Sequence, residues 1–338
     1  MTTQKTRIGR RAPGFFSGAL AVGLFLGASA ATVQAAAAKA YVGNFKDNTV
    51  SVIDTGAGKV VATVPVAAGP HGMAQSPDGR MVYVSGDLSS TVSVIDAATD
   101  RVAHTIEVGK APHGLAMRSD GGLLLVAVYG EDRVALVDPA TRAVVGTIPV
   151  AKPHTIAVRP DGKSAYVASQ EPGKFALAVV DLGSRAVVGR IELDKPPRDL
   201  EFGYDGKRLY LTVAGVNAVQ VLDPASDKIV AEIPTGASPH IAGYYRGAPA
   251  GVAVVQGPGE LLLFDPATNA AVKSVAVGKQ PHWVAMAGDG KTAYVTNEGS
   301  NDLSVVDLAT GGTTTIAVGS APRKVVVQQT APTARKGN

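Results

Sequence analysis

The side chains best suited to chemistry in this chain are its histidines. Five of the six histidines follow a proline, and two arginines follow a proline at the corresponding place in a repeat. Neutral imidazoles bind Zn or Cu, whereas guanidinium groups and protonated imidazoles bind anions. If the repeat brings these side chains together, the sequence predicts a single ring of basic groups. The ring residues recur at intervals of 41 to 44 positions and are His71, His113, His154, Arg198, His240, His282 and Arg323.

Three interpretations of this ring follow from its chemistry. In the first, its five histidines hold a transition metal, Zn or Cu, and the three consecutive ones, His71, His113 and His154, are the natural set. In the second, its two arginines oppose a bare cation and, with Trp283 beside His282, bind a small anion or another ligand. In the third, the residue after the proline is structural and hydrogen-bonds to the neighbouring repeat. We take the metal as the leading functional hypothesis and assign no catalytic residue.

The elements that must position the ring are short strands in a repeating unit. Each unit holds four β-rich runs separated by turn residues, and in the first full unit these are 72–75, 81–85, 91–95 and 102–108. Aspartate–glycine pairs such as Asp78-Gly79 mark tight turns in five of the units. A four-stranded unit of about 42 residues is the size of a β-propeller blade. An aspartate that we expect to bind its own turn ends one run of each unit: Asp54, Asp96, Asp138, Asp181, Asp223, Asp265 and Asp307.

The two ends of the repeat predict how the blades close. The first unit begins in mid-repeat, with runs at 40–43, 49–53 and 59–66, and the last run, 324–329, is a first strand alone. Three N-terminal strands and one C-terminal strand would make a mixed blade that removes free sheet edges. We therefore predict an all-β, seven-bladed propeller with four antiparallel strands per blade over residues 39–329, and a disordered tail at 330–338. In this fold the ring of basic residues lies at the mouth of the central channel.

Several repeats carry a recognisable signature. Residues 293–297 read AYVTN, and 40–44 (AYVGN) and 81–85 (MVYVS) are variants of it. The sequence SVID also occurs twice, at 51–54 and 93–96. Together with these runs and the aspartate–glycine turns, the motifs make residues 40–329 resemble the YVTN-repeat seven-bladed β-propeller family. The resemblance implies the fold and an exported bacterial protein, but no single activity. Family members include proteins encoded near quinone-cofactor alcohol oxidation systems, surface-layer proteins and a periplasmic single-stranded-DNA binder.

The formal charge of +4 belongs to the N-terminal segment. Residues 1–38 contain four of the 32 bases and none of the 28 acids, so the rest of the chain is neutral. A basic start, the apolar run 15–31 and small residues before Ala35 predict a signal peptide at 1–38, cleaved near Ala35 to Ala38. The mature protein is expected in the periplasm, without stable membrane insertion. The absence of cysteine excludes disulfides, thiolate metal sites and covalently attached c-type haem.

The sequence thus favours a non-catalytic periplasmic binding protein, expected to be a monomer, whose His/Arg ring binds a metal ion. The alternatives are a protein-interaction scaffold for an exported redox or transport system, or a small-anion or single-stranded nucleic acid binder. Zero net charge argues against nucleic acid. If the histidines titrate together near about pH 6 to 7, the channel mouth becomes strongly positive while the whole protein stays near neutral. Glu201 is the one obvious acid on an inner strand, and acids predicted in loops near the ring are Asp47, Asp87, Glu131, Asp132, Glu171, Glu260, Glu298 and Asp302.

Overall fold

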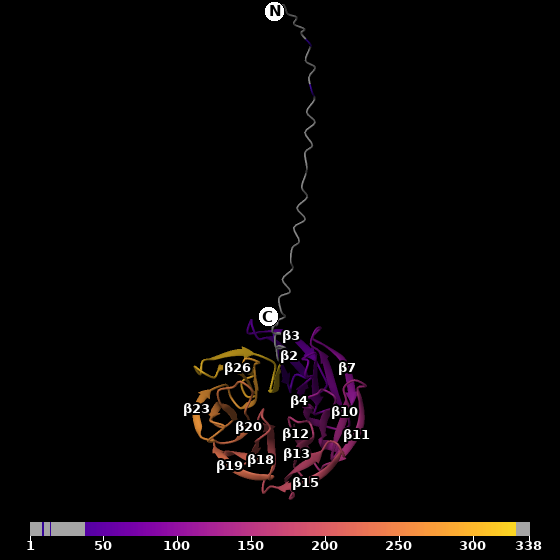
Figure 1. The fold of residues 1–338 in the computed structure, drawn as a ribbon, viewed down its shortest axis with the longest axis vertical. Coiled ribbons are helices and arrows are strands. Elements are labelled where there is room, and N and C mark those ends of the chain that lie inside the picture. Colours follow the sequence, from indigo (N-terminus) through magenta and orange to yellow (C-terminus); the bar gives the residue numbers. More distant parts are fainter. Residues whose placement is uncertain (1–8, 10–13, 15–37, 329–338) are drawn as a thin grey trace, which may run out of the picture. The chain divides into compact units, whose positions relative to one another are not determined.

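The computed structural model describes Gly9, Gly14 and residues 38–328. Residues 38–328 form seven four-stranded antiparallel sheets arranged around a central axis (Figure 1). Each sheet is one blade, and the first strand of each lies innermost and contacts the first strands of the two neighbouring blades. The predicted seven-bladed, all-β propeller is confirmed. The predicted leader, apart from Gly9, Gly14 and Ala38, and the predicted tail at 330–338 lie outside the described residues.

Six blades are formed by strands consecutive in sequence. The first three are β4 (Pro70–Gln75), β5 (Met81–Gly86), β6 (Thr91–Asp96) and β7 (Arg101–Glu107); β8 (Pro112–Met117), β9 (Leu124–Val128), β10 (Arg133–Asp138) and β11 (Ala143–Pro149), with the 3₁₀ turn η1 (Tyr129–Glu131); and β12 (Pro153–Val158), β13 (Ser164–Ser169), β14 (Ala176–Asp181) and β15 (Ala186–Glu192). The next three are β16 (Pro197–Phe202), β17 (Leu209–Val213), β18 (Ala218–Asp223) and β19 (Lys228–Pro234); β20 (Pro239–Gly243), β21 (Gly251–Val255), β22 (Glu260–Phe264) and β23 (Ala271–Ala276); and β24 (Pro281–Met286), β25 (Thr292–Asn297), β26 (Asp302–Asp307) and β27 (Thr313–Ala317).

The seventh blade joins the two ends of the described chain. Its order is β28 (Pro322–Val327), β1 (Lys39–Asn44), β2 (Thr49–Asp54) and β3 (Lys59–Pro65). In the antiparallel register between β1 and β28, Tyr41 lies opposite Val326 and Val42 opposite Val325. The mixed blade predicted from the ends of the repeat is therefore confirmed, and it closes the ring of blades.

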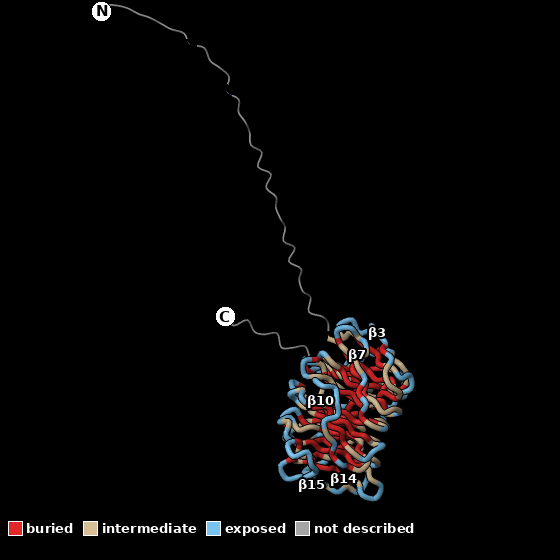
Figure 2. The backbone as a smooth tube through the Cα atoms, turned by 90° about the vertical axis from the view of Figure 1, so that its right-hand side faces the viewer, coloured by how far each residue is buried: buried red, intermediate tan, exposed pale blue. Residues whose placement is uncertain are grey.

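Burial follows the position of a strand in its blade. The second and third strands are almost entirely buried, because both of their faces pack against neighbouring blades, whereas outer strands such as β3 alternate between exposed and covered residues. Figure 2 shows this as buried backbone inside the propeller and exposed turns at its periphery. Among the described residues, no helix is long and apolar enough to cross a membrane. The core is thus a series of layers between blades.

Each inner strand has an irregularity at its ring residue. Its pairing with the second strand shifts register just after the proline, for example between Pro70 and Met73 and between Pro281 and Trp283. The same shift occurs in all seven blades. A bulge re-aims the side chain that it carries. This local geometry turns the ring residues toward the channel rather than into the layers between blades.

Hydroxyl groups on three of the second strands, from Ser85, Thr212 and Thr296, connect their blade to the next. Thr296, from the YVTN signature, accepts a hydrogen bond from the Trp283 amide (3.0 Å) and donates one to the Arg323 carbonyl of the next blade (2.7 Å). Ser85 makes the equivalent pair with Gly72 and the His113 carbonyl. Because Thr296 is fully buried, water cannot replace it. The signature therefore positions the backbone of the ring.

Replacing Thr296 by valine tests this role. Valine keeps the shape of threonine but leaves a buried amide and a buried carbonyl without partners, so we expect the free energy of unfolding to fall by about 1–3 kcal/mol. Equilibrium denaturation with urea measures the change. The matched control is Thr314→Val, at an exposed position of the outer strand β27. Equal effects of the two replacements would contradict the assigned role.

Candidate functional site

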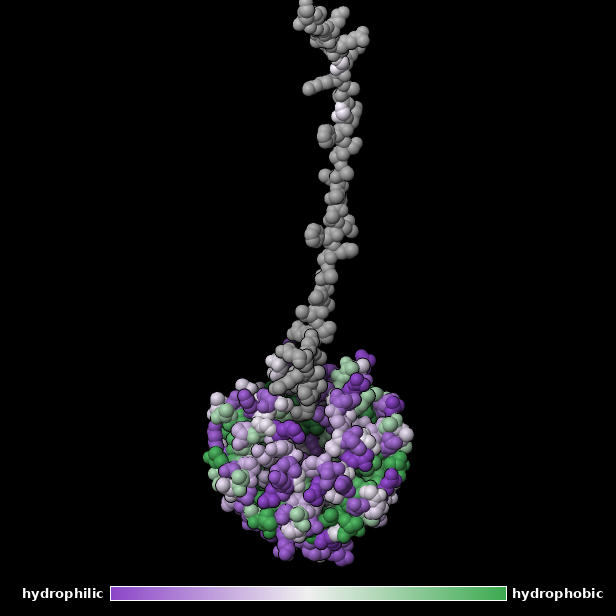
Figure 3. Space-filling model, in the orientation of Figure 1, coloured by the Kyte–Doolittle hydropathy of each residue, from purple (hydrophilic) through white to green (hydrophobic). Residues whose placement is uncertain are grey.

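Two cavities of about 480 Å³ each occupy the channel, one toward the ring and one toward the opposite face. The ring cavity is lined by all seven ring residues, together with Gln170, Gln256 and Glu298. The second cavity is lined by the remaining parts of the inner strands, including Met73, Met117 and Glu201. On the face seen in Figure 3 the centre of the propeller is hollowed. Residues that line both cavities mark where the two meet: Gly114, Thr155, Asp199, Trp283 and Lys324.

The five histidines of the ring lie against one another. Ring centroids are 3.9 Å apart between His71 and His113, between His113 and His154, and between His240 and His282. His71 and His282 join the two groups in an edge-on contact at 5.7 Å. The array therefore runs from His154 to His240 through His71, and the gap between its two ends is the place of Arg198.

Three of the histidines also hold the blades together. Nδ1 of His113 lies 3.0 Å from the His154 carbonyl, Nδ1 of His154 lies 2.9 Å from the Arg198 carbonyl, and Nδ1 of His282 lies 3.1 Å from the Arg323 carbonyl. A carbonyl only accepts, so each Nδ1 carries the proton and each Nε2 has a free lone pair. The structural interpretation of the residue after proline holds for these three. His240 differs, because its buried Nδ1 has no partner among the described residues.

Burial keeps the imidazoles neutral. Loss of solvation lowers the pKa of His71, His113 and His282 well below the usual value, and that of His154 and His240 to about 4 and about 3. Neighbouring histidines and the two arginines lower these values further. The lowered pKa values argue against joint titration of the ring histidines near pH 6 to 7. Sequence does not reveal that the imidazole rings pack against one another, with His113 and His282 buried and the other three half-buried.

The two arginines of the ring have different surroundings. Arg323 lies over the Phe45 ring, 3.6 Å from its centroid, and its Nη2 is 3.4 Å from Glu298, while its buried Nε has no partner. Arg198 donates from Nη1 to the Ser238 hydroxyl (2.7 Å). Within the described part of the chain, no carboxylate oxygen lies within 4 Å of the Arg198 guanidinium. Arg198 is thus a cation on the cavity wall that has no counter-ion.

Few of the acids predicted near the ring line its cavity. Of the eight expected in loops near the ring, only Glu298 lines the ring cavity, where it lies near Arg323 and 4.0 Å from His282 Nε2. Others pair locally, as Glu131 does with Arg133 at 2.7 Å. The strand-ending aspartates bind their own turns as expected; for example, Asp54 accepts from the amides of Gly56 and Ala57. None of these turn aspartates lines either cavity.

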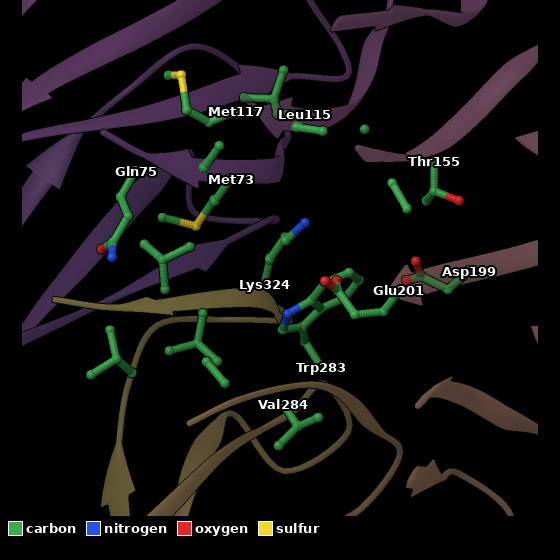
Figure 4. A pocket seen from close by; sticks show the side chains of 18 of the residues that line it. Met73, Gln75, Leu115, Met117, Thr155, Asp199, Glu201, Trp283, Val284 and Lys324 are labelled. Atoms are coloured by element: carbon green, nitrogen blue, oxygen red, sulfur yellow. The ribbon is translucent and has the colours of Figure 1, made fainter. Parts of the chain in front are cut away.

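Two ionisable residues in the channel were missed by the sequence analysis. Asp199 and Lys324 each follow a ring arginine, and both line the two cavities. Figure 4 shows their side chains around one space with Trp283 and Glu201. Lys324 Nζ is 3.8 Å from the centroid of the Trp283 ring. The signal that would have found them is their repeat position, which is held by Gly, Thr, Ile or Trp in the other five blades.

Burial shifts the pKa values of these channel groups. It raises the pKa of Asp199 well above its usual value and that of Glu201 to about 6. It lowers the pKa of Lys324, although the charges of Asp199 and Glu201 partly oppose this. Trp283 is 9% exposed and packs in the core layer with Val284, so it forms both the wall of the channel and the contact between blades.

The metal interpretation has mixed geometric support. The described residues contain no group of three or more His, Cys, Asp or Glu side chains placed to hold a metal ion. The Nδ1 bonds to carbonyls are nevertheless the arrangement by which proteins orient metal-binding histidines. Metal binding would require the stacked rings to turn.

Comparisons with known proteins agree on the architecture. A family model described as YNCE-like beta-propeller matches residues 22–121. The fold of this chain is that of a YVTN-type seven-bladed propeller. Hydrazine synthase of Kuenenia stuttgartiensis aligns with a TM-score of 0.72 and 22% identity, covering 79% of this chain and 91% of that chain. The dihydro-heme d1 dehydrogenase NirN, in complex with DHE, aligns with a TM-score of 0.64 and 19% identity, covering 85% and 74%. No curated protein matches significantly.

The neutral imidazoles predict an acid-sensitive fold. A ring histidine that is neutral in the folded protein takes up a proton on unfolding once the pH is below about 6.5. The free energy of unfolding should therefore fall as the pH is lowered from about 6.5 toward 4, by about 1.4 kcal/mol per pH unit for each such histidine. Asp199 and Glu201 oppose the trend, because their raised pKa values mean that they release protons on unfolding over part of this range.

Denaturation at several pH values measures this slope. In His240→Gln the slope should decrease by about 1.4 kcal/mol per pH unit, which corresponds to one proton. His104→Gln, on the outer strand β7, is the control for a histidine outside the ring. A His240→Gln slope identical to that of the unmodified protein would show that His240 is not neutral in the folded state.

Proposed function

We propose that this chain is an exported binding protein whose ring cavity binds a small organic anion, with its carboxylate at Arg198. The observation that carries the proposal is the Arg198 guanidinium, which lines a cavity of about 480 Å³ and has one hydroxyl partner but no carboxylate. A guanidinium has five donors and binds a carboxylate through two parallel hydrogen bonds. A cavity of this size takes a small ligand.

The rest of the cavity wall favours a ligand that also has polar hydrogens. Where the histidine Nδ1 is bonded to a carbonyl, Nε2 accepts hydrogen bonds from hydroxyl or amino groups. Gln170 and Gln256 add amide donors and acceptors. Because the imidazoles are neutral, the charge that selects the ligand comes from Arg198, with Arg323 and Lys324 nearby in the same cavity.

Arg198→Gln tests the anion site. Pyruvate and succinate serve as the first probes in isothermal titration calorimetry, and for the probe that binds we expect affinity to fall at least about tenfold, or about 1.4 kcal/mol. Loss of a charge-assisted hydrogen bond is the physical reason. Arg101→Gln, exposed on β7, is the matched control. Equal affinities of the Arg198→Gln and Arg101→Gln proteins would overturn the assignment of Arg198.

A second candidate ligand is a transition metal, Zn or Cu, held by the histidines. The observation in its favour is the set of Nδ1 bonds from His113, His154 and His282, which leave Nε2 free in each. Metal analysis of untagged protein, repeated for His113→Ala, tests it. Stoichiometric metal that is lost in this variant would favour the metal, whereas no uptake from micromolar Zn or Cu would favour the anion alone.

Export to the periplasm is part of the proposal. The fold supports cleavage within the window predicted from the sequence, since the first blade strand begins at Lys39. The Ala38 carbonyl accepts hydrogen bonds from the backbone amide and the hydroxyl of Thr55. We expect the mature protein to keep Ala38 and to begin at one of residues 36 to 38. N-terminal sequencing of protein from the periplasmic fraction checks this, and an uncleaved chain in the cytoplasm would contradict it.

A further inference from the structure

Lys324 is a channel residue whose chemistry goes beyond anion binding. It lies where the two cavities meet, and its side chain lines both of them. Figure 4 shows it pointing into the space that Trp283, Glu201 and Asp199 also face. A ligand in the ring cavity therefore has access to its amine.

The surroundings of the amine are apolar on one side. Nζ lies 3.8 Å from the centroid of the Trp283 ring, and no carboxylate oxygen of the described residues lies within 4 Å of it. Met73 and Leu115 line the second cavity, on the side of Lys324 away from the ring. A lysine that is taken out of water loses its proton more readily and becomes a nucleophile. Lys324 is half-buried in the channel wall, and this partial loss of solvation lowers its pKa.

Two proton-holding groups accompany the amine. Asp199 and Glu201 lie on the inner strand β16, and Asp199 is only 2% exposed. Asp199 Oδ1 accepts a hydrogen bond from the Leu200 amide at 2.8 Å, which fixes the carboxyl group at the channel wall. Burial raises the pKa values of both acids. A carboxylic acid that keeps its proton near neutral pH can give it to a departing hydroxyl group.

We propose that Lys324 Nζ forms a reversible imine with the carbonyl carbon of a 2-oxo acid in the central channel. The nitrogen lone pair attacks the carbonyl carbon and forms the C–N bond, and one N–H proton moves to the oxygen. The C–O bond then breaks, and the hydroxyl leaves as water with a proton from Asp199 or Glu201. The remaining N–H proton returns to that carboxylate. One water is released for each imine, and no oxidant or reductant takes part.

The ligand class rests on the proposed anion site. Arg198 and Lys324 line the same cavity of about 480 Å³. In the proposed complex the carboxylate of the 2-oxo acid is bound by Arg198, and its oxo group faces the part of the same cavity wall that Lys324 forms. Binding in one cavity makes the attack effectively unimolecular, which raises its rate. A neutral aldehyde can react with the same amine without help from Arg198.

Borohydride trapping followed by peptide mass spectrometry tests the imine. The purified protein is incubated with pyruvate, and in parallel with propanal, and sodium borohydride then reduces any imine to a stable secondary amine. We expect Lys324 to be labelled by pyruvate at least about tenfold faster than Lys59, an exposed lysine on β3. Lys324→Arg keeps the positive charge and should lose the label. Arg198→Gln should slow labelling by pyruvate about tenfold and leave labelling by propanal unchanged.

The outcomes separate the imine from the anion site. Labelling of Lys324 no faster than Lys59, by either probe, overturns the imine. Pyruvate binding that depends on Arg198, seen without any adduct, also overturns the imine but supports the proposed function. Fast labelling by both probes that Arg198→Gln does not affect supports the imine and overturns the carboxylate site at Arg198. Thermal melting of Lys324→Arg confirms that a lost adduct is not a lost fold.

Discussion

The structure depends on hydrogen bonds that the carbonyl groups of ring residues accept from the preceding blade. The Arg323 carbonyl accepts from both Thr296 and His282, and the Arg198 carbonyl accepts from His154 and Thr155. A propeller blade can bury its two faces only against the two neighbouring blades. These bonds set the relative position of adjacent blades at the point where they come closest to the channel. The residues that form the wall of the site thus also make the contacts between blades.

The same bonds determine the electrostatics of the channel. A carbonyl partner fixes the proton on Nδ1, and packing of imidazole on imidazole removes the water that would stabilise a second proton. The ring that looks like a reservoir of positive charge in the sequence is therefore largely neutral. Positive charge without a counter-ion is concentrated instead at Arg198. A neutral wall around a few charges is the usual composition of a site that selects a small ligand.

The fold could be read from the sequence because its signals are local and repeat at a fixed interval. Asp54 binds its own turn two and three residues away, and such a contact depends on nothing elsewhere in the chain. The closing blade also follows, because the repeat begins with three strands of a unit and ends with the one strand that this unit lacks. The position of the ring was predicted for the same reason, since seven equivalent residues in a closed array must lie on one circle.

The chemistry of the site could be predicted only in part. The neutrality of the histidines arises from contacts such as that of His71 with His113, which join different blades and depend on the bulge in each inner strand. Asp199 and Lys324 are far apart in sequence and become a pair only when β16 and β28 face the same channel. The aspartate–glycine turns and apolar runs that reveal the blades carry no information about such pairs.

The closing blade also decides when the site comes into existence. β28 brings both Arg323 and Lys324 into the channel, and it is the last strand of the propeller to emerge during synthesis. A chain that lacks β28 has the other six inner strands but not these two side chains. Proteolytic removal of β28 would open the seventh blade and remove Arg323 and Lys324 from the channel. Pairing of β28 with β1, closure of the propeller and assembly of the site are therefore one event.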